Sequence, residues 1–437
     1  MKVCISTLGC KLNQAESDKL ARQFLLSGHE IVASPHEADL HIVNTCAVTH
    51  TAVRKSRKAL RKGLQHRTDL VTVLTGCYAE MAPREIQNLA GVDLVVGNRD
   101  KEQLLKLLEA TPVTRGHLLR PGPDTDSGPA PLTADQVPPE LWAGEQAIPR
   151  TRAFVKIQDG CNMRCAFCII PLVRGRERSR PRSQIIDEIR SLVTAGHQEV
   201  VLTGVQISAY RDGGVRLREL VSEILGETAV SRLRLSSLAP WHVDRRLLKL
   251  WAEGRMCRHL HLSLQSGSDT VLRRMKRPYT AARYAEVAEL AREMIADVAI
   301  TTDVIVGFPG ETQAEFKESR RFVERMRFAR VHVFSYSARD GTVAAGMHPQ
   351  VPPRVKQSRS RVMREIAKRS AESYQQRFIG RTMDVLWESR ANGCWCGLTD
   401  NYIRVTAEHR EGLTNAIVPA ELVELTGDGV RARVVAG

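Results

Sequence analysis

The stretch DGCNMRCAFCIIP, residues 159–171, decides how this sequence is interpreted. Its three cysteines, Cys161, Cys165 and Cys168, follow the spacing CxxxCxxC and place three thiolates on one short loop. A cubane iron–sulfur cluster has four irons that each need an outer ligand, and clusters that only carry electrons usually have four cysteines. Three cysteines leave one iron open to bind a small molecule. Spaced cysteines in a chain of intracellular type favour metal over three unrelated core cysteines.

A second set of three cysteines is scattered over the first eighty residues. Cys10, Cys46 and Cys77 each end an apolar run that is typical of a strand, in TLGC, VNTC and LTGC. The carboxyl ends of parallel strands share one edge of a sheet, where ligands collect. We therefore expect another three-thiolate site there, with ordinary buried cysteines as the alternative. The other four cysteines are interpreted as structural: Cys4, Cys257, Cys394 and Cys396.

Length and composition indicate a globular protein of about three domains. The chain has 437 residues, 43% of them hydrophobic and 26% charged. Its start, MKVCISTLGC, does not resemble a signal peptide, and no apolar run is long enough to span a membrane. Ten cysteines in such a chain favour a reducing, cytoplasmic location. The net charge of +15 favours nucleic acid as a partner over a membrane, with a well-solvated surface as the alternative.

Two alternating series of strands and helices predict an α/β fold with parallel sheets. In residues 1–118 the predicted strands are Lys2–Leu8, Ala38–Asn44, Leu70–Thr75 and Val92–Val96, and the predicted helices are Asp18–Ser27 and Thr49–Gln65. Residues 119–149 are rich in proline and predict an extended linker. A second series in residues 150–375 has predicted strands at Ala153–Gln158, Glu199–Gln206, Arg232–Ser236, His259–Gln265, Ala299–Gly307 and Arg330–Tyr336, with a helix at Ser183–Ala195. Six such repeats predict a partial (β/α)6 barrel with its chemistry at the carboxyl ends of the strands.

The end of the chain predicts a different architecture. A basic helix, Val355–Phe378, leads into residues 376–437. Short strands separated by glycine and asparagine turns predict a small β-barrel there. They are Arg381–Glu388, Tyr402–Thr406, Ala416–Pro419 and Val430–Val435.

Together these motifs resemble the methylthiotransferase family of radical S-adenosylmethionine (SAM) enzymes. The resemblance covers nearly the whole chain and includes TLGCKLNQAES (residues 7–17), LSLQSGSDTVLRRMKRPYT (262–280) and TTDVIVGFPGET (301–312). It implies an N-terminal domain with an auxiliary cluster, a radical SAM barrel and a C-terminal TRAM domain. The first motif and YSARDGTVAA (336–345) most resemble the branch that acts on N6-threonylcarbamoyladenosine in tRNA.

The resemblance implies two [4Fe-4S] clusters and SAM as cofactors. One cluster, on Cys161, Cys165 and Cys168, is expected to cleave SAM, and the other, on Cys10, Cys46 and Cys77, to present sulfur. The reaction implied is replacement of the hydrogen on carbon-2 of the adenine, next to the anticodon, by a methylthio group. Its partners are then the anticodon stem-loop of tRNA, a sulfur donor and an electron donor, with no membrane.

Candidate SAM contacts follow the predicted strands of the barrel. The resemblance places Phe167 beside the adenine of SAM, and Thr203 and Gly204 where many radical SAM enzymes receive its amino group. Ser236, Gln265 and Asp303 stand at the ends of the next three strands and are interpreted as further SAM contacts, or as turn and cap formers.

Candidate RNA contacts come from two other segments. The loop IIPLVRGRERSR carries Arg174, Arg176, Arg178 and Arg180, whose guanidinium groups suit the SAM carboxylate or tRNA phosphates, or a solvated basic loop. In GLTDNYIRV, Tyr402 and Arg404 match the TRAM pattern and suit base stacking and phosphate contact, although Tyr402 fits a core position equally well.

Four other functions remain open from the sequence. Within the family, the substrate could be isopentenyladenosine in tRNA or an aspartate of a ribosomal protein, and the basic charge favours RNA. The chain could also be a nonenzymatic iron–sulfur protein that binds RNA, but the open iron argues against this because a passive cluster gains nothing from it. A sulfur-inserting enzyme that resembles lipoyl synthase is the fourth alternative, and the terminal barrel disfavours it.

Overall fold

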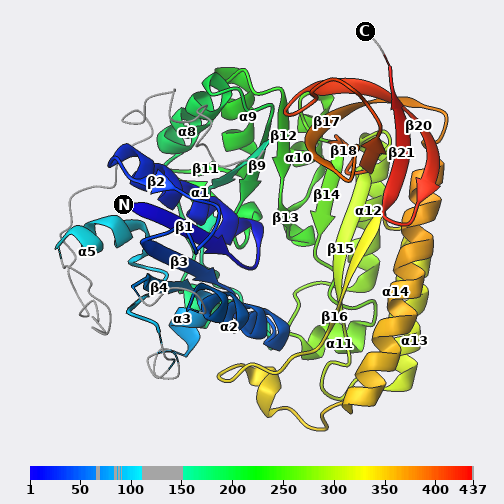
Figure 1. The fold of residues 1–437 in the computed structure, drawn as a ribbon. Helices are drawn as coiled ribbons and strands as arrows, with labels where there is room; N and C mark the ends of the chain where they lie inside the picture. The colour runs from blue at the N-terminus through cyan, green and yellow to red at the C-terminus, as the bar shows by residue number, and fades with distance from the viewer. Residues whose placement is uncertain (65–68, 83–85, 87–88, 90, 111–150, 436–437) are drawn as a thin grey trace.

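The computed structural model describes residues 1–64, 69–82, 86, 89, 91–110 and 151–435 of the chain. An N-terminal sheet, a central arc of strands and a small C-terminal barrel follow one another along the chain (Figure 1). The predicted linker, residues 119–149, lies outside the described residues, and so do the domain boundaries at its two ends. The predicted boundary at 375/376 falls at the end of the long helix α14 (Pro353–Gln376) and stays a prediction.

The N-terminal part is a five-stranded parallel sheet in the order β2-β1-β3-β4-β5. Its strands are β1 (Lys2–Thr7), β2 (Glu30–Ile31), β3 (Leu40–Thr45), β4 (Val71–Gly76) and β5 (Leu94–Val96). Every residue of β3 and all but the first of β4 are buried, as expected for a parallel sheet covered by helices. The predicted parallel sheet is confirmed, and it gains β2, which is too short for a sequence pattern to reveal.

The helices of this part are α1 (Lys11–Leu26), α2 (His50–Leu64), α3 (Cys77–Met81) and α5 (Leu104–Ala110). Helix α1 begins directly after Cys10, seven residues before the predicted start at Asp18. Its first two turns bury Asn13, Glu16 and Ser17, so they lack the apolar spacing on which the prediction rested. In the same turns, Ala15 packs against the central strands, which places α1 between the N-terminal sheet and the barrel.

The central part is an arc of parallel strands in chain order, as a partial barrel requires. Its strands are β6 (Arg152–Lys156), β9 (Glu199–Thr203), β12 (Arg232–Leu235), β13 (Ser237–Leu238), β14 (His259–Leu262), β15 (Ala299–Val306) and β16 (Arg330–Ser335). The short β13 continues β12 and pairs with β14, which joins the two halves of the arc. The predicted six-repeat barrel is therefore confirmed.

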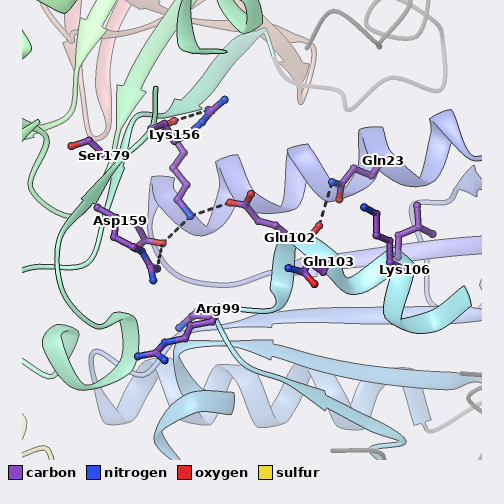
Figure 2. Close-up of a pocket in the computed structure, with 12 residues that line it drawn as sticks. Gln23, Arg99, Glu102, Gln103, Lys106, Lys156, Asp159 and Ser179 are labelled. Carbon is purple, nitrogen blue, oxygen red and sulfur yellow. Dashed lines mark hydrogen bonds and ion pairs between the residues drawn. The ribbon is translucent and has the colours of Figure 1, made fainter. Parts of the chain in front are cut away.

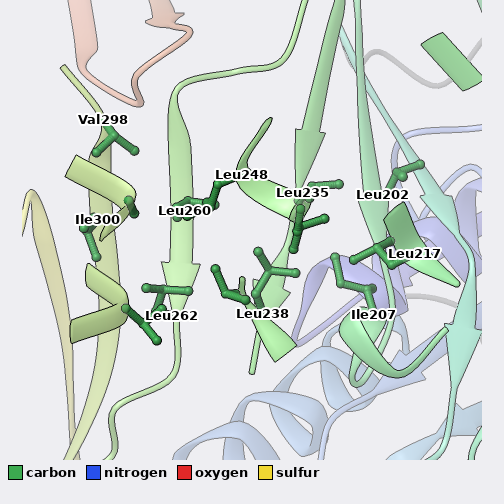
Figure 3. Close-up of a cluster of buried hydrophobic side chains, with 14 of the residues drawn as sticks. Leu202, Ile207, Leu217, Leu235, Leu238, Leu248, Leu260, Leu262, Val298 and Ile300 are labelled. Atoms are coloured by element: carbon green, nitrogen blue, oxygen red, sulfur yellow. The ribbon is translucent and has the colours of Figure 1, made fainter. Parts of the chain in front are cut away.

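Helices pack on one side of this arc. They are α8 (Arg182–Thr194), α9 (Leu217–Glu227), α10 (Arg245–Leu248), α12 (Ala281–Met294) and α13 (Gln313–Met326). Leu202, Leu235, Leu260 and Ile300, from successive strands, meet the helices in one apolar core (Figure 3). Because side chains alternate along a strand, the intervening residues face the opposite side, where the cavity lies.

The C-terminal part is a closed five-stranded barrel in the order β17-β18-β19-β21-β20, which confirms the predicted small β-barrel. Its strands are β17 (Thr382–Ala391), β18 (Cys394–Thr399), β19 (Arg404–Ala407), β20 (Ile417–Thr426) and β21 (Gly429–Val434). Strand β18, which was not predicted, contains the CWC segment and buries Trp395 in the barrel core. Buried Arg234 on β12 ties this barrel to the central part, since it pairs with Glu199 at 2.6 Å and donates to the carbonyl of Asp400 at 2.9 Å. None of the helices in the described ranges is both long and apolar enough to cross a bilayer.

Candidate functional site

Three cysteines of the N-terminal sheet meet at the carboxyl edge of its strands, as predicted. Cys10 follows β1, Cys46 follows β3 and Cys77 follows β4. A Cβ atom on Gly9, which has φ +110°, would lie 3.1 Å from the Sγ of Cys46. A Cβ on Gly76, with φ +98°, would lie 2.4 Å from the carbonyl oxygen before Cys46. The GC dipeptides are therefore needed for the close approach of these loops.

Two asparagines hold the loops of this auxiliary triad in place. The Nδ2 of Asn13 donates to the carbonyl of Leu8 at 2.7 Å and to that of Thr45 at 2.9 Å. The Nδ2 of Asn98 donates to the carbonyl of Val173 at 2.7 Å and lies 3.8 Å from the Sγ of Cys77. Burial raises the pKa of the Cys46 thiol to about 11, so its deprotonation needs a bound cation, which iron supplies.

A buried ion network lies behind the auxiliary triad. Glu16 pairs with Lys101 at 2.7 Å, with Lys156 at 3.1 Å and with Arg174 at 2.8 Å, and Arg174 also pairs with Asp159 at 2.9 Å. These groups come from both the N-terminal part and the central part, so the network fixes one against the other.

The prediction that Arg174 binds RNA is corrected by this arrangement. Arg174 is only 3% exposed, and carboxylates and Asn13 occupy its guanidinium group, so no RNA phosphate reaches it. Arg180 donates to the carbonyl of Lys156 and pairs with Glu188, and it is partly buried. Arg178 is exposed, and its role as an RNA contact stays a prediction.

A polar cavity of about 290 Å³ opens beside this network, between α1 and the start of the barrel (Figure 2). Lys156 reaches toward Glu102 and Asp159 along its wall. Arg178 and Arg180 line it as well.

The second triad lies on the loop after β6 and the short strand β7 (Gln158–Asp159). A Cβ on Gly160, with φ +66°, would overlap the carbonyl of Arg176 at 2.0 Å, so only glycine fits before Cys161. Arg277 Nη1 donates to the Sγ of Cys165 at 3.3 Å, and Gln206 Oε1 lies 3.3 Å from the Sγ of Cys161.

Iron–sulfur clusters are held by cysteine thiolates, and each triad supplies three of them. In the part of the chain that is described, no three cysteine sulfurs lie within 4.8 Å of one another, the compactness that a single ion needs. Burial raises the pKa of Cys168 to about 12, and Arg277 supplies a neighbouring positive charge. All ten cysteines are free of disulfides.

A cavity of about 510 Å³ lies between the auxiliary triad and the barrel strands. Four predicted SAM contacts line it: Thr203, Gly204, Ser236 and Asp303. A Cβ on Gly204 would lie 2.6 Å from the carbonyl of Gln158, so the chain passes closely there. The buried Oγ of Ser236 has no hydrogen-bond partner, which fits a wall built for a polar ligand.

The other two predicted SAM contacts lie outside the wall of this cavity. Phe167 packs against Ala166 and its apolar neighbours beside the second triad. Gln265, with φ +69°, exchanges backbone hydrogen bonds of 2.8 Å with Asp303 and Ile305. Both remain predicted contacts.

Histidines from the strands form the polar floor of the cavity. His261, Asp303 and His332 bring their ligand atoms within 4.8 Å of one another. The Nε2 of His261 is 3.2 Å from Asp303, and its Nδ1 is 3.0 Å from the Oγ1 of Thr301. Both nitrogens of His261 therefore have partners in the chain.

Tyr402 lines this cavity, and its role as an RNA contact stays a prediction. Its ring stacks on His259, with 4.2 Å between the ring centroids. Arg404, two residues further on, is exposed on β19 and stays a predicted RNA contact.

Sequence reasoning missed Lys11, Gln206 and Arg277, which stand beside the triads. Lys11 and Arg277 are within the motifs quoted above, but nothing in the sequence separates them from the 64 lysines and arginines of the chain.

Comparisons with known proteins agree with this geometry. Residues 155–323 match the family described as "Radical SAM superfamily", and residues 2–97 match "Uncharacterized protein family UPF0004". The chain is 35% identical to the threonylcarbamoyladenosine tRNA methylthiotransferase MtaB of Bacillus subtilis, with 97% of this chain and 94% of the relative covered. The protein of the same name from Aquifex aeolicus is 36% identical, with 93% and 97% covered.

A tRNA-2-methylthio-N(6)-dimethylallyladenosine synthase from Akkermansia muciniphila is 31% identical, with 98% of this chain and 97% of the relative covered. Among solved structures, the radical S-adenosylmethionine methyltransferase TsrM from Kitasatospora setae, with cobalamin and a [4Fe-4S] cluster bound, has a TM-score of 0.57 at 16% identity. That match covers 79% of this chain and 77% of TsrM, and it shows the fold alone. With two cysteine triads, a radical SAM barrel and relatives above 30% identity over nearly its full length, this chain belongs to the radical SAM methylthiotransferase family.

Proposed function

We propose that this enzyme converts N6-threonylcarbamoyladenosine next to the anticodon of tRNA to its 2-methylthio derivative. The observation that carries the proposal is the cavity that Cys10 of the auxiliary triad shares with the barrel strands, in a chain that has a second three-cysteine site and resembles relatives with this activity. One incompletely ligated site is enough to cleave SAM. The second needs a different role, and sulfur delivery is the role that the family offers.

The residues divide into groups around the two clusters. Cys161, Cys165 and Cys168 would hold the cluster that binds SAM, and Cys10, Cys46 and Cys77 the auxiliary one. When bound, these groups supply one-electron reduction, abstraction of a hydrogen atom, and sulfur and methyl transfer.

The chain itself contributes positioning and shelter from water. Arg277 and Gln206 orient two cysteines of the SAM site. Thr203, Gly204, Ser236 and Asp303 bind SAM from the wall of the cavity. Carbon-2 of the adenine has no acidic proton, so no side chain is needed as a general base, and the protein supplies geometry instead.

Exposed cations suit the RNA. Arg178 and Arg404 lie on the surface, and the net charge of +15 favours a polyanion. We infer that the anticodon stem-loop places its modified base in the cavity beside Cys10. The sulfur and electron donors are separate partners, and the reducing cytoplasm is the compartment that suits free thiols and clusters.

The decisive experiment compares two modified tRNAs. The anaerobically reconstituted enzyme is given SAM, a reductant and tRNA that carries either threonylcarbamoyladenosine or isopentenyladenosine, and the digested tRNA is analysed by nucleoside mass spectrometry. We expect the 2-methylthio product from the first RNA only. Product from the second RNA alone would move the function to the dimethylallyladenosine branch. Formation of 5′-deoxyadenosine without either product would leave a radical enzyme with another substrate.

A further inference from the structure

Among the described residues that line the cavity of about 510 Å³, Lys11 is a cation that lacks an anionic partner. It stands directly after Cys10, at the first position of α1, and lines the cavity between the auxiliary triad and the barrel strands. Its Nζ lies 5.6 Å from the centre of the Tyr402 ring and makes no ion pair or hydrogen bond with the described residues. Arg152, the other lining cation of fixed charge, is paired with Glu388 at 2.6 Å.

None of the other described residues on the polar wall offers the Lys11 ammonium group a free anion. Asp303 is the one carboxylate among the described lining residues, and His261 holds it at 3.2 Å. His332 stands beside this pair. The buried Nδ1 of His259, on the same wall, has no partner either. Lys11 therefore presents an unpaired positive charge to whatever enters from the auxiliary side.

Lys11 is partly buried, and a second cation, Arg234, lies over the same Tyr402 ring, 5.1 Å from its centroid. An ammonium group in such surroundings gains much from an anion brought in by a ligand, because charge-assisted hydrogen bonds strengthen where water is excluded.

We propose that Lys11 binds the carboxylate of the threonylcarbamoyl group and so selects this anionic base over neutral ones. The inference rests on the proposed function. The threonylcarbamoyl group is attached to the same six-membered ring as carbon-2, which must approach the auxiliary site, so its carboxylate comes close to the residue that follows Cys10. An isopentenyl group carries no charge and would leave the amine unpaired, which a site built for a polar group strongly disfavours.

The test is a cycle of two changes, one in the enzyme and one in the RNA. Wild type and Lys11→Gln, each with both clusters assembled, are assayed on an anticodon stem-loop with threonylcarbamoyladenosine and on the same RNA with its carboxylate converted to a methylamide. Each change alone should lower kcat/KM for the methylthio product by about ten- to a hundredfold, the value of a hydrogen bond to a charged group. The two together should lower it no further than one does, because both remove the same contact.

Two variants control for indirect effects. Lys19→Gln removes a lysine two turns along α1, outside this cavity, and should keep kcat/KM within about twofold of wild type. Lys11→Arg keeps the charge and should recover part of the loss. Iron content and the SAM dissociation constant are measured for every variant.

Several results would overturn the inference. Equal activity of Lys11→Gln and wild type on the carboxylate RNA would do so, and so would losses that multiply across the cycle, since Lys11 would then act elsewhere. A weakened affinity for SAM in Lys11→Gln would assign the lysine to the SAM carboxylate instead. If wild type does not modify the carboxylate RNA at all, the proposed function fails and this inference with it, whereas an active wild type with an insensitive Lys11 contradicts the inference alone.

Discussion

The Nη2 of Arg174 donates to the Oδ1 of Asn13 at 2.7 Å and so connects the two cysteine triads. Arg174 ends α7 (Ile170–Arg174), the helix that follows the SAM-site cysteines. Through its amide nitrogen, Asn13 holds the carbonyl of Leu8, two residues before Cys10, and that of Thr45, directly before Cys46. A single guanidinium group therefore sets the position of one site against the other.

Replacing Arg174 by methionine should destabilise the protein and its auxiliary site together. Glu16 and Asp159 would lose a buried partner, and breaking such a pair costs about 3 to 5 kcal/mol. Thermal unfolding and iron content measure the two effects. Arg178→Met, at an exposed arginine of the same loop, is the control, and equal stability and iron content in both variants would contradict the role given to Arg174.

Substitutions in the two triads should affect different steps of the reaction. Cys168→Ser is expected to abolish formation of 5′-deoxyadenosine from SAM, because it removes a ligand of the cluster that binds SAM. Cys46→Ser should keep that reaction and lose the methylthio product. Nucleoside analysis of both alongside Cys394→Ser, a cysteine outside both triads, makes the comparison. Loss of SAM cleavage in Cys46→Ser, with the SAM-site cluster shown to be intact, would count against the division of labour.

The strands of both sheets could be predicted because buried parallel strands are continuous apolar runs. The same reasoning missed the start of α1, since Asn13 and Glu16 are buried there as partners of Arg174 and Lys101. An ion network that joins residues about 160 positions apart leaves no local pattern. For the same reason Arg174 looked like a surface arginine of a basic loop.

The site was predictable where spacing or strand ends define it. CxxxCxxC is local, and the convergence of Cys10, Cys46 and Cys77 follows from parallel topology. Arg277 and Lys11 depend instead on which way a side chain points once the sheet and the barrel are packed together. The position of Tyr402 also depends on this packing, because its ring stacks on His259 of the central part.

Ser236→Ala should weaken SAM binding without destabilising the protein when SAM is absent. Its buried hydroxyl lacks a partner in the chain, so a hydrogen bond from SAM would be worth about 0.5 to 1.5 kcal/mol, or roughly two- to tenfold in affinity. Without SAM the variant should unfold at the same or a higher temperature, because an unsatisfied buried group is removed. Equilibrium binding and thermal unfolding test both parts, with exposed Ser231→Ala as the control. An unchanged dissociation constant would remove Ser236 from the SAM site.

His41 should make the protein sensitive to mild acid. It is fully buried on β3, its Nε2 lies 2.9 Å from the Oγ of Ser6, and its Nδ1 has no partner. Burial lowers the pKa of His41 from 6.5 to about 4, so the unfolded chain takes up a proton at a higher pH than the folded chain does. The contribution of this residue to stability is then complete above pH 6.5 and is lost as the pH falls to about 4, a change of about 3 kcal/mol. His41→Gln removes this proton uptake, so the difference in unfolding temperature between variant and wild type should shift in favour of the variant as the pH is lowered from 7 to 4. Cluster loss in acid affects both proteins alike, and a difference that stays constant with pH would show that His41 does not titrate in this range.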